Sequence, residues 1–247
     1  MLLASGLSPQ MIRTRLDSGQ LVRVRRGVFV AADAWPHDAA GQHTMRARAE
    51  LVLSPGAVLS HRTAALVWGL PHPDLMPWEA GEPTVSEPTH GSAKSRSGPV
   101  VHHLALLPAG HVTRDDAGYA VTTVARTAVD LAAGLDLPQA LVLLDAASRK
   151  VCEAMLVHIR RADYLNPQLI RAARDLLIDA ARVRRSASLA PAIELTQPCR
   201  ESPAESLSAG YFHLAGLPTP LFQHAIRTPY GTFYPVLLAR AATDRRV

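Results

Sequence analysis

The chain has 247 residues, of which 48% are hydrophobic and 19% are charged, so it can bury a core and lacks the composition of a disordered protein. Its formal net charge of +5 favours an anionic partner. The sequence has no apolar run of about eighteen residues, and its first residues lack the basic leader of a signal peptide. We therefore expect a cytoplasmic protein with no membrane contact. The lone cysteines, Cys152 and Cys199, predict no disulfide framework and suggest structural roles.

The positive charge is concentrated in the first thirty residues. Five arginines stand there against one acid, Asp17, which leaves +4: Arg13, Arg15, Arg23, Arg25 and Arg26. Ser8 is a good N-cap, Pro9 suits the first helical position and Gly19 suits the residue after a helix, so a short helix is predicted between them. The run from Leu21 to Val30 then predicts two strands that turn at Arg26-Gly27.

A helix followed by an arginine-tipped hairpin is the outline of a winged helix-turn-helix, which we predict for residues 1–32. Gln10, Arg13 and Thr14 would face the major groove of double-stranded DNA, and Arg23, Arg25 and Arg26 would hold phosphates. If all five arginines of the segment met phosphates, the log–log salt slope of binding would be about −4 to −5. The first helix of the motif would have to lie within Leu2–Leu7, so it is short or missing. The alternative is a basic, solvated hairpin that binds no nucleic acid.

Residues 40–150 alternate between helical and strand patterns and predict a mixed α/β domain. Helices are expected over 42–54, 60–68, 123–133 and 138–150, and strands over 57–60, 84–86 and 100–107, with loops through most of 71–99 and a turn at 114–118. The first of these helices would carry Met45, Ala49, Val52 and Leu53 on one side.

Two polar pairs in this region invite a catalytic or metal-binding interpretation. Ser60-His61 could be a nucleophile and its base, but an N-cap followed by an ordinary histidine is the expected reading. His102-His103 could hold a metal, but neighbouring residues of a strand point to opposite faces. The i,i+4 pairs Arg126/Asp130 and Asp145/Arg149 are expected to be structural ion pairs.

Residues 151–198 are predicted to be a helical connector. An apolar stripe runs through Leu169, Ala173, Leu177 and Ala180, and the last part, 186–198, reads as a linker. Several arginines lie on the other faces, where they form either a solvated surface or a second nucleic-acid contact: Arg171, Arg174, Arg182, Arg184 and Arg185.

The segment from Leu7-Ser8-Pro9 through Arg13 to the Gly19–Val30 run resembles the winged helix of AbiEi-type antitoxins, which belong to abortive-infection toxin–antitoxin pairs. Val58–Leu70 and Tyr119–Ala132, followed by Ala140–Ala146, are similar to the rest of that domain, so the resemblance covers roughly residues 1–150. It implies repressor-like binding to promoter DNA and a nucleotidyltransferase toxin as a partner.

Residues 199–247 are similar to the start of very-short-patch-repair endonucleases, a branch of the PD-(D/E)xK nucleases. In that family Glu205 would hold Mg²⁺ together with later acids, and a hairpin is expected over 226–234 with its turn at Tyr230-Gly231. After Tyr234 the expected acids are missing, which suggests a frameshift or a truncated gene. Glu205 is then the only matching remnant, a helix N-terminal carboxylate. Part of the fragment would lack its core and would be mobile or pack on a neighbour: Leu207, Phe212, Leu214, Leu217 and Phe222.

The sequence thus predicts an α+β protein in four parts: a winged helix (1–32), an α/β domain (40–150), a helical connector (151–198) and an incomplete α/β nuclease-like fragment (199–247). The preferred function is a DNA-binding transcriptional regulator without catalytic activity, cofactor or metal. The alternatives are a DNA endonuclease, degenerate or truncated here, which would need Mg²⁺, and a toxin-neutralising interaction module.

Overall fold

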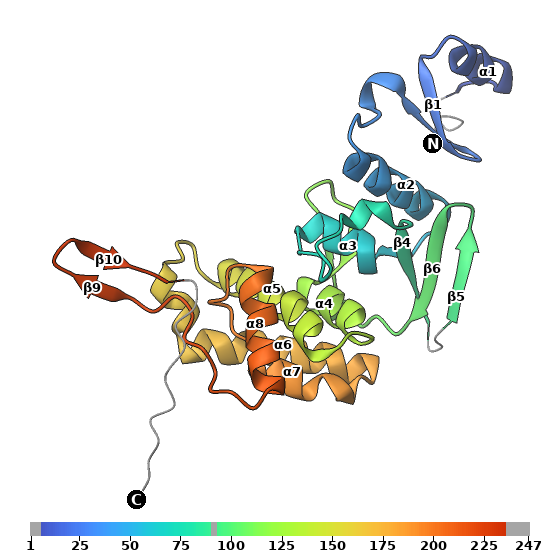
Figure 1. Cartoon of the computed structure of the whole chain (residues 1–247). Coiled ribbons are helices and arrows are strands. Elements are labelled where there is room, and N and C mark those ends of the chain that lie inside the picture. The colour runs from blue at the N-terminus through green and yellow to red at the C-terminus, as the bar shows by residue number, and fades with distance from the viewer. Residues whose placement is uncertain (1–5, 90–92, 236–247) are drawn as a thin grey trace, which may run out of the picture. The chain divides into compact units, whose positions relative to one another are not determined.

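The computed structural model describes residues 6–89 and 93–235 (Figure 1). It is a mixed α and β structure that divides into two compact units. The first unit comprises Met1–Gly69 and Pro77–Thr123, and the second comprises Leu70–Met76 and Val124–Val247. The boundaries of the four parts expected from the sequence differ from those of these two units. The division into four separately folding domains stays a prediction.

The first unit begins with a helix and a hairpin. Helix α1 (Pro9–Asp17) starts where Ser8 Oγ accepts a hydrogen bond from the Met11 amide at 3.2 Å, and Gly19 follows it with a φ of 70°. Strands β1 (Leu21–Arg25) and β2 (Val28–Ala31) pair antiparallel around Gly27, whose φ is 82°. These elements are confirmed as predicted. The first helix expected in Leu2–Leu7 lies almost wholly outside the described residues.

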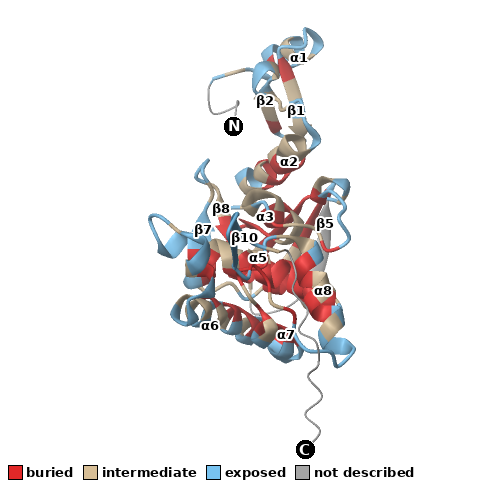
Figure 2. Ribbon diagram, turned by 60° about the vertical axis from the view of Figure 1, so that its left-hand side comes forward, coloured by how far each residue is buried: buried red, intermediate tan, exposed pale blue. Residues whose placement is uncertain are grey.

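A six-stranded sheet forms the body of the first unit, in the order β5-β6-β4-β3-β8-β7. Its strands are β3 (Val58–Leu59), β4 (Thr84–Pro88), β5 (Ala93–Ser97), β6 (Val100–Ala105), β7 (Val112–Arg114) and β8 (Ala120–Thr122). The pairs β3/β8 and β4/β6 are parallel, and the other pairs are antiparallel. Helices α2 (Ala39–Leu53) and α3 (His61–Trp68) pack on this sheet, and Leu59, Val85 and Val121 are fully buried in its core (Figure 2).

Two sequence-based expectations for this unit were wrong. The stretch expected to be mostly loop contains β5, which pairs along β6 and turns at Gly98. Helix α2 does not bury Val52 and Leu53, each of which is 39% exposed. It buries His43 and Glu50 instead, because polar groups of the neighbouring elements lie under that face, such as Thr63 Oγ1, 2.9 Å from His43 Nε2.

The second unit is mainly helical and ends in a short hairpin. Its elements are α4 (Val124–Ala132), α5 (Leu137–Met155), α6 (Pro167–Arg184), α7 (Ala190–Leu195), α8 (Pro203–Leu214), β9 (Ile226–Thr228) and β10 (Gly231–Phe233). Cys152, Tyr164, Ala173 and Phe222 share one buried core. The helices at 123–133 and 138–150 and the hairpin at 226–234 are confirmed.

Three expectations for the second unit were corrected. The stretch read as a linker holds α7, and Ile193 on it is 2% exposed. The Asp145/Arg149 pair does not form, because Asp145 Oδ2 lies 2.9 Å from Arg200 Nη1. The C-terminal fragment is not stripped of its core, since Phe222 is buried, although Leu214 and Leu217 are exposed. No helix among residues 6–89 and 93–235 combines the length and apolar character needed to cross a membrane.

Candidate nucleic-acid interface

Helix α1 presents a polar face to solvent. Gln10, Arg13 and Thr14 stand at i, i+3 and i+4, which places them on one side of the helix, and all three are exposed. Thr14 Oγ1 donates to the Gln10 carbonyl at 3.1 Å, so its hydroxyl keeps acceptor capacity. Ile12 is buried and fixes which face turns inward. The structure therefore brings together the three residues that the sequence assigned to the groove.

The three arginines of the hairpin differ in exposure and in their partners. Arg23 and Arg26 are exposed, whereas Arg25 forms an ion pair with the buried carboxylate of Glu50 on α2. The strand register shifts between Arg23, opposite Phe29, and Arg25, opposite Val28. Such a bulge re-aims the side chains that follow it. The sequence pattern showed neither the bulge nor Glu50 as a partner, because both depend on packing against α2.

Ser60 and His61 do not make an accessible nucleophile and base. Ser60 Oγ lies 3.0 Å from His61 Nδ1 and accepts a hydrogen bond from Ser86 Oγ at 2.8 Å, but Ser60 is fully buried. The side chain also makes no capping bond to α3, although Ser60 occupies the N-cap position. A substrate cannot reach the Ser60 hydroxyl. Its hydrogen bond with Ser86 instead helps to hold the end of β3 against β4.

His102 and His103 point to different partners, as expected for neighbours on a strand. His102 Nδ1 lies 2.7 Å from Glu87 Oε1, and its Nε2 lies 3.2 Å from Glu50 Oε1. The His103 ring stacks on His61 with centroids 3.8 Å apart. Across residues 6–89 and 93–235, no three or more His, Cys, Asp and Glu side chains are grouped so that they could hold a metal ion.

Glu205 closes the start of α8. Its carboxylate accepts from the Ser202 amide at 2.9 Å and from Gln223 Nε2 at 3.0 Å, while Ser202 Oγ accepts from the Glu205 amide. This reciprocal arrangement is a capping box, and Glu205 is 2% exposed within it. The carboxylate therefore already serves the helix end, as its position in the sequence suggested.

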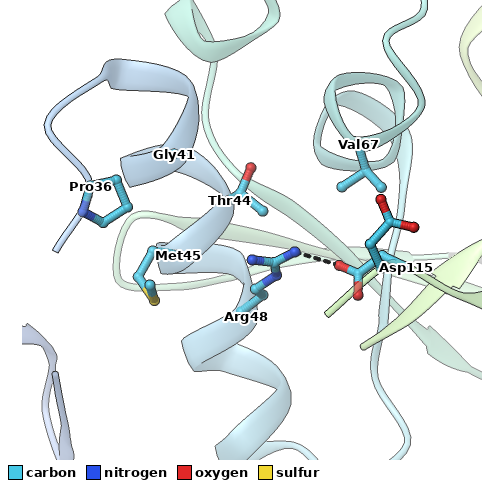
Figure 3. Close-up of a pocket in the computed structure, with 8 residues that line it drawn as sticks. Pro36, Gly41, Thr44, Met45, Arg48, Val67 and Asp115 are labelled. Carbon is cyan, nitrogen blue, oxygen red and sulfur yellow. Dashed lines mark hydrogen bonds and ion pairs between the residues drawn. The ribbon is translucent and has the colours of Figure 1, made fainter. Parts of the chain in front are cut away.

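A pocket of about 300 Å³ lies on the first unit beside α2 (Figure 3). It is lined by Pro36, Gly41, Thr44, Met45, Arg48, Val67, Asp115 and Asp116. Arg48 Nη2 donates to Asp115 Oδ2 at 2.7 Å, and Asp115 Oδ1 accepts from the amides of Ala117 and Tyr119. The Arg48–Asp115 pair ties α2 to the β7–β8 turn, and sequence spacing could not indicate this contact.

Comparison with known proteins points to the N-terminal segment. A protein-family model described as "Transcriptional regulator, AbiEi antitoxin" matches residues 1–32, which contain α1 and the β1–β2 hairpin. No curated protein matches the chain. The match agrees with the antitoxin resemblance over that segment alone, and it does not extend to residues 199–247, whose nuclease-like interpretation stays without support.

Proposed function

We propose that the chain is a DNA-binding transcriptional regulator of the antitoxin type, which uses α1 and the β1–β2 hairpin as a winged helix. One observation carries the proposal: the segment matched by the regulator family displays Gln10, Arg13, Arg23 and Arg26 to solvent together. An exposed helix face beside exposed arginines is the combination that such modules use to enter a groove and to hold its phosphates.

The two elements divide the work by chemistry. In the major groove an arginine can donate two hydrogen bonds to guanine, and a glutamine can pair in the same way with adenine. Arg13 and Gln10 on α1 therefore serve sequence recognition, with Thr14 as a neighbouring hydroxyl contact. Arg23 and Arg26 serve phosphates, which fix the orientation of the module without reading sequence.

Fluorescence anisotropy tests this division with two labelled duplexes of equal length. One carries the DNA immediately upstream of the coding sequence, and the other carries the same bases shuffled. The upstream duplex should bind more tightly, and Arg13→Ala should reduce that preference by roughly 5- to 150-fold, the value of one good base contact. Arg171→Ala removes an exposed arginine of the second unit and should preserve the preference. Equal affinity of the wild type for both duplexes would reject sequence-specific regulation.

The antitoxin description also supports a toxin partner, which the resemblance implies is a nucleotidyltransferase. Co-expression with a neighbouring nucleotidyltransferase gene should yield a complex that survives affinity purification. The competing endonuclease hypothesis predicts Mg²⁺-dependent cleavage of plasmid DNA that is lost in Glu205→Gln. Our proposal predicts no cleavage by either protein.

A further inference from the structure

A row of ionisable side chains links the hairpin to the sheet of the first unit. Arg25, the last residue of β1, forms an ion pair with Glu50 on α2. Glu50 Oε1 in turn lies 3.2 Å from His102 Nε2 on β6, and His102 Nδ1 lies 2.7 Å from Glu87 Oε1 on β4. The contacts therefore run through β1, α2, β6 and β4 in turn, and Glu50, which joins the first three, is 2% exposed.

The burial of Glu50 makes this link strong. Taking a carboxylate out of water is costly, and removing one partner of a buried pair leaves a charge that nothing compensates. Arg25 has a side chain that is 21% exposed, so it is partly desolvated along with Glu50. To hold a phosphate, Arg25 would have to leave the carboxylate behind.

The apolar core of the hairpin is small. Within α1, β1 and β2, the buried apolar residues are Ile12, Leu21 and Val28. Such a small core stabilises the module weakly. The strand register shifts before Arg25, which pairs with Glu50 on α2, while Arg23 remains exposed, so one strand supplies both an anchor and a contact arginine.

We infer that Glu50 is a positioning residue for DNA binding: it holds the hairpin through Arg25 so that Arg23 and Arg26 are presented to phosphates. Arg25 is then an anchor and not a phosphate ligand. This inference rests on the proposed function and deepens it, because it assigns a part of the α/β body to the same interface.

Two variants that lose the same charge can distinguish a positioning role of Glu50 from a general electrostatic effect on DNA affinity. Glu50→Gln and Asp17→Asn each remove one negative charge from the first unit, and Asp17 is exposed on α1. Electrostatics alone predicts tighter DNA binding for both variants. We expect Asp17→Asn to bind more tightly and Glu50→Gln to bind roughly tenfold more weakly, with a salt slope smaller by about 1 to 2, since mispositioned Arg23 and Arg26 lose phosphates.

Amide hydrogen exchange tests the anchor in the free protein, without DNA. Glu50→Gln should speed exchange several-fold in residues 21–31 and leave Val121 and Thr122 protected, which are buried in β8 and outside the contacts of Glu50, whereas Asp17→Asn should change neither. Unchanged exchange in the hairpin, or DNA binding by Glu50→Gln as tight as by Asp17→Asn, would overturn the inference. Failure of the wild type to bind any duplex would instead overturn the proposed function, and the role of Glu50 in binding with it.

Discussion

At the residue scale, burial in the core of the second unit controls the reactivity of its two thiols. Cys152 and Cys199 are both free and buried, and they belong to the same cluster as Tyr164 and Phe222. Burial raises the pKa of Cys199 to about 11, and it also raises the pKa of Cys152. The thiolate is the reactive form of cysteine, so both side chains are held in their inert state.

Thiol labelling at pH 8 checks this account. The native protein should react with a thiol reagent far more slowly than the chain in guanidinium chloride, where both cysteines should react at the rate of a free thiol. Because the folded pKa of Cys199 is raised, its contribution to stability is complete below the unfolded pKa near 8.5 and is lost as the pH rises toward 11. Rapid labelling of one thiol at pH 8 in the native state would contradict the buried placement.

Charged residues show where prediction from the sequence stops. The Arg126/Asp130 pair was predictable because i,i+4 neighbours meet on any helix, but its burial and the second partner of Asp130, Arg184, were not. Asp145 pairs with Arg200, 55 residues away, instead of Arg149. The packing of the helices determines which arginine pairs with Asp145, and local sequence spacing does not predict that partner.

At the element scale, α8 packs against α5 at a glycine. A Cβ at Gly210 would lie 2.5 Å from Pro138 Cα, so α8 can sit at this distance only with a bare Cα at that position. A Gly→Ala change inside a helix usually stabilises by roughly 1 kcal/mol. Here the clash with backbone reverses the sign.

We expect Gly210→Ala to lower the free energy of unfolding by about 1–3 kcal/mol, the usual cost of overpacking. Urea denaturation followed by circular dichroism measures the change. Ser208→Ala on the same helix is the comparison, because Ser208 is only half-buried and its change should stay within about 0.5 kcal/mol. A stabilised Gly210→Ala protein would show that the two helices do not meet as described.

Elements with local signals were predictable, and elements that depend on distant partners were not. Ser8, Pro9, Gly19 and the Arg26-Gly27 turn mark α1 and the hairpin with caps and turn residues. Strand β5 is defined by its pairing with β6, and α7 by the burial of Ile193. Both β5 and α7 lie in proline- or serine-rich stretches, and neither sequence has a strong periodic pattern of apolar residues.

At the scale of the whole molecule, the arginines differ in how far they are engaged within the fold. In the first unit Arg13, Arg23 and Arg26 are exposed on α1 and the hairpin. In the second unit Arg174 donates to the Thr196 carbonyl and Arg184 pairs with Asp130, so part of the arginine-rich helix α6 stabilises its own fold. Arg171 and Arg182 of α6 are exposed as well, so exposure alone does not assign DNA binding to α1 and the hairpin, and the assignment stays a prediction.

The salt dependence of duplex binding by the full chain tests this central claim most directly. With Arg25 held by Glu50 and Arg13 assigned to a base, Arg23 and Arg26 should contribute about −1.8 to the log–log slope of the full chain. The double variant Arg23→Ala/Arg26→Ala should therefore make the slope shallower by about 1.8, because two phosphate contacts are lost. The charge-matched control Arg171→Ala/Arg182→Ala, on the exposed side of α6, should keep the wild-type slope. Equal slopes for the two double variants would contradict a DNA interface built from α1 and the hairpin.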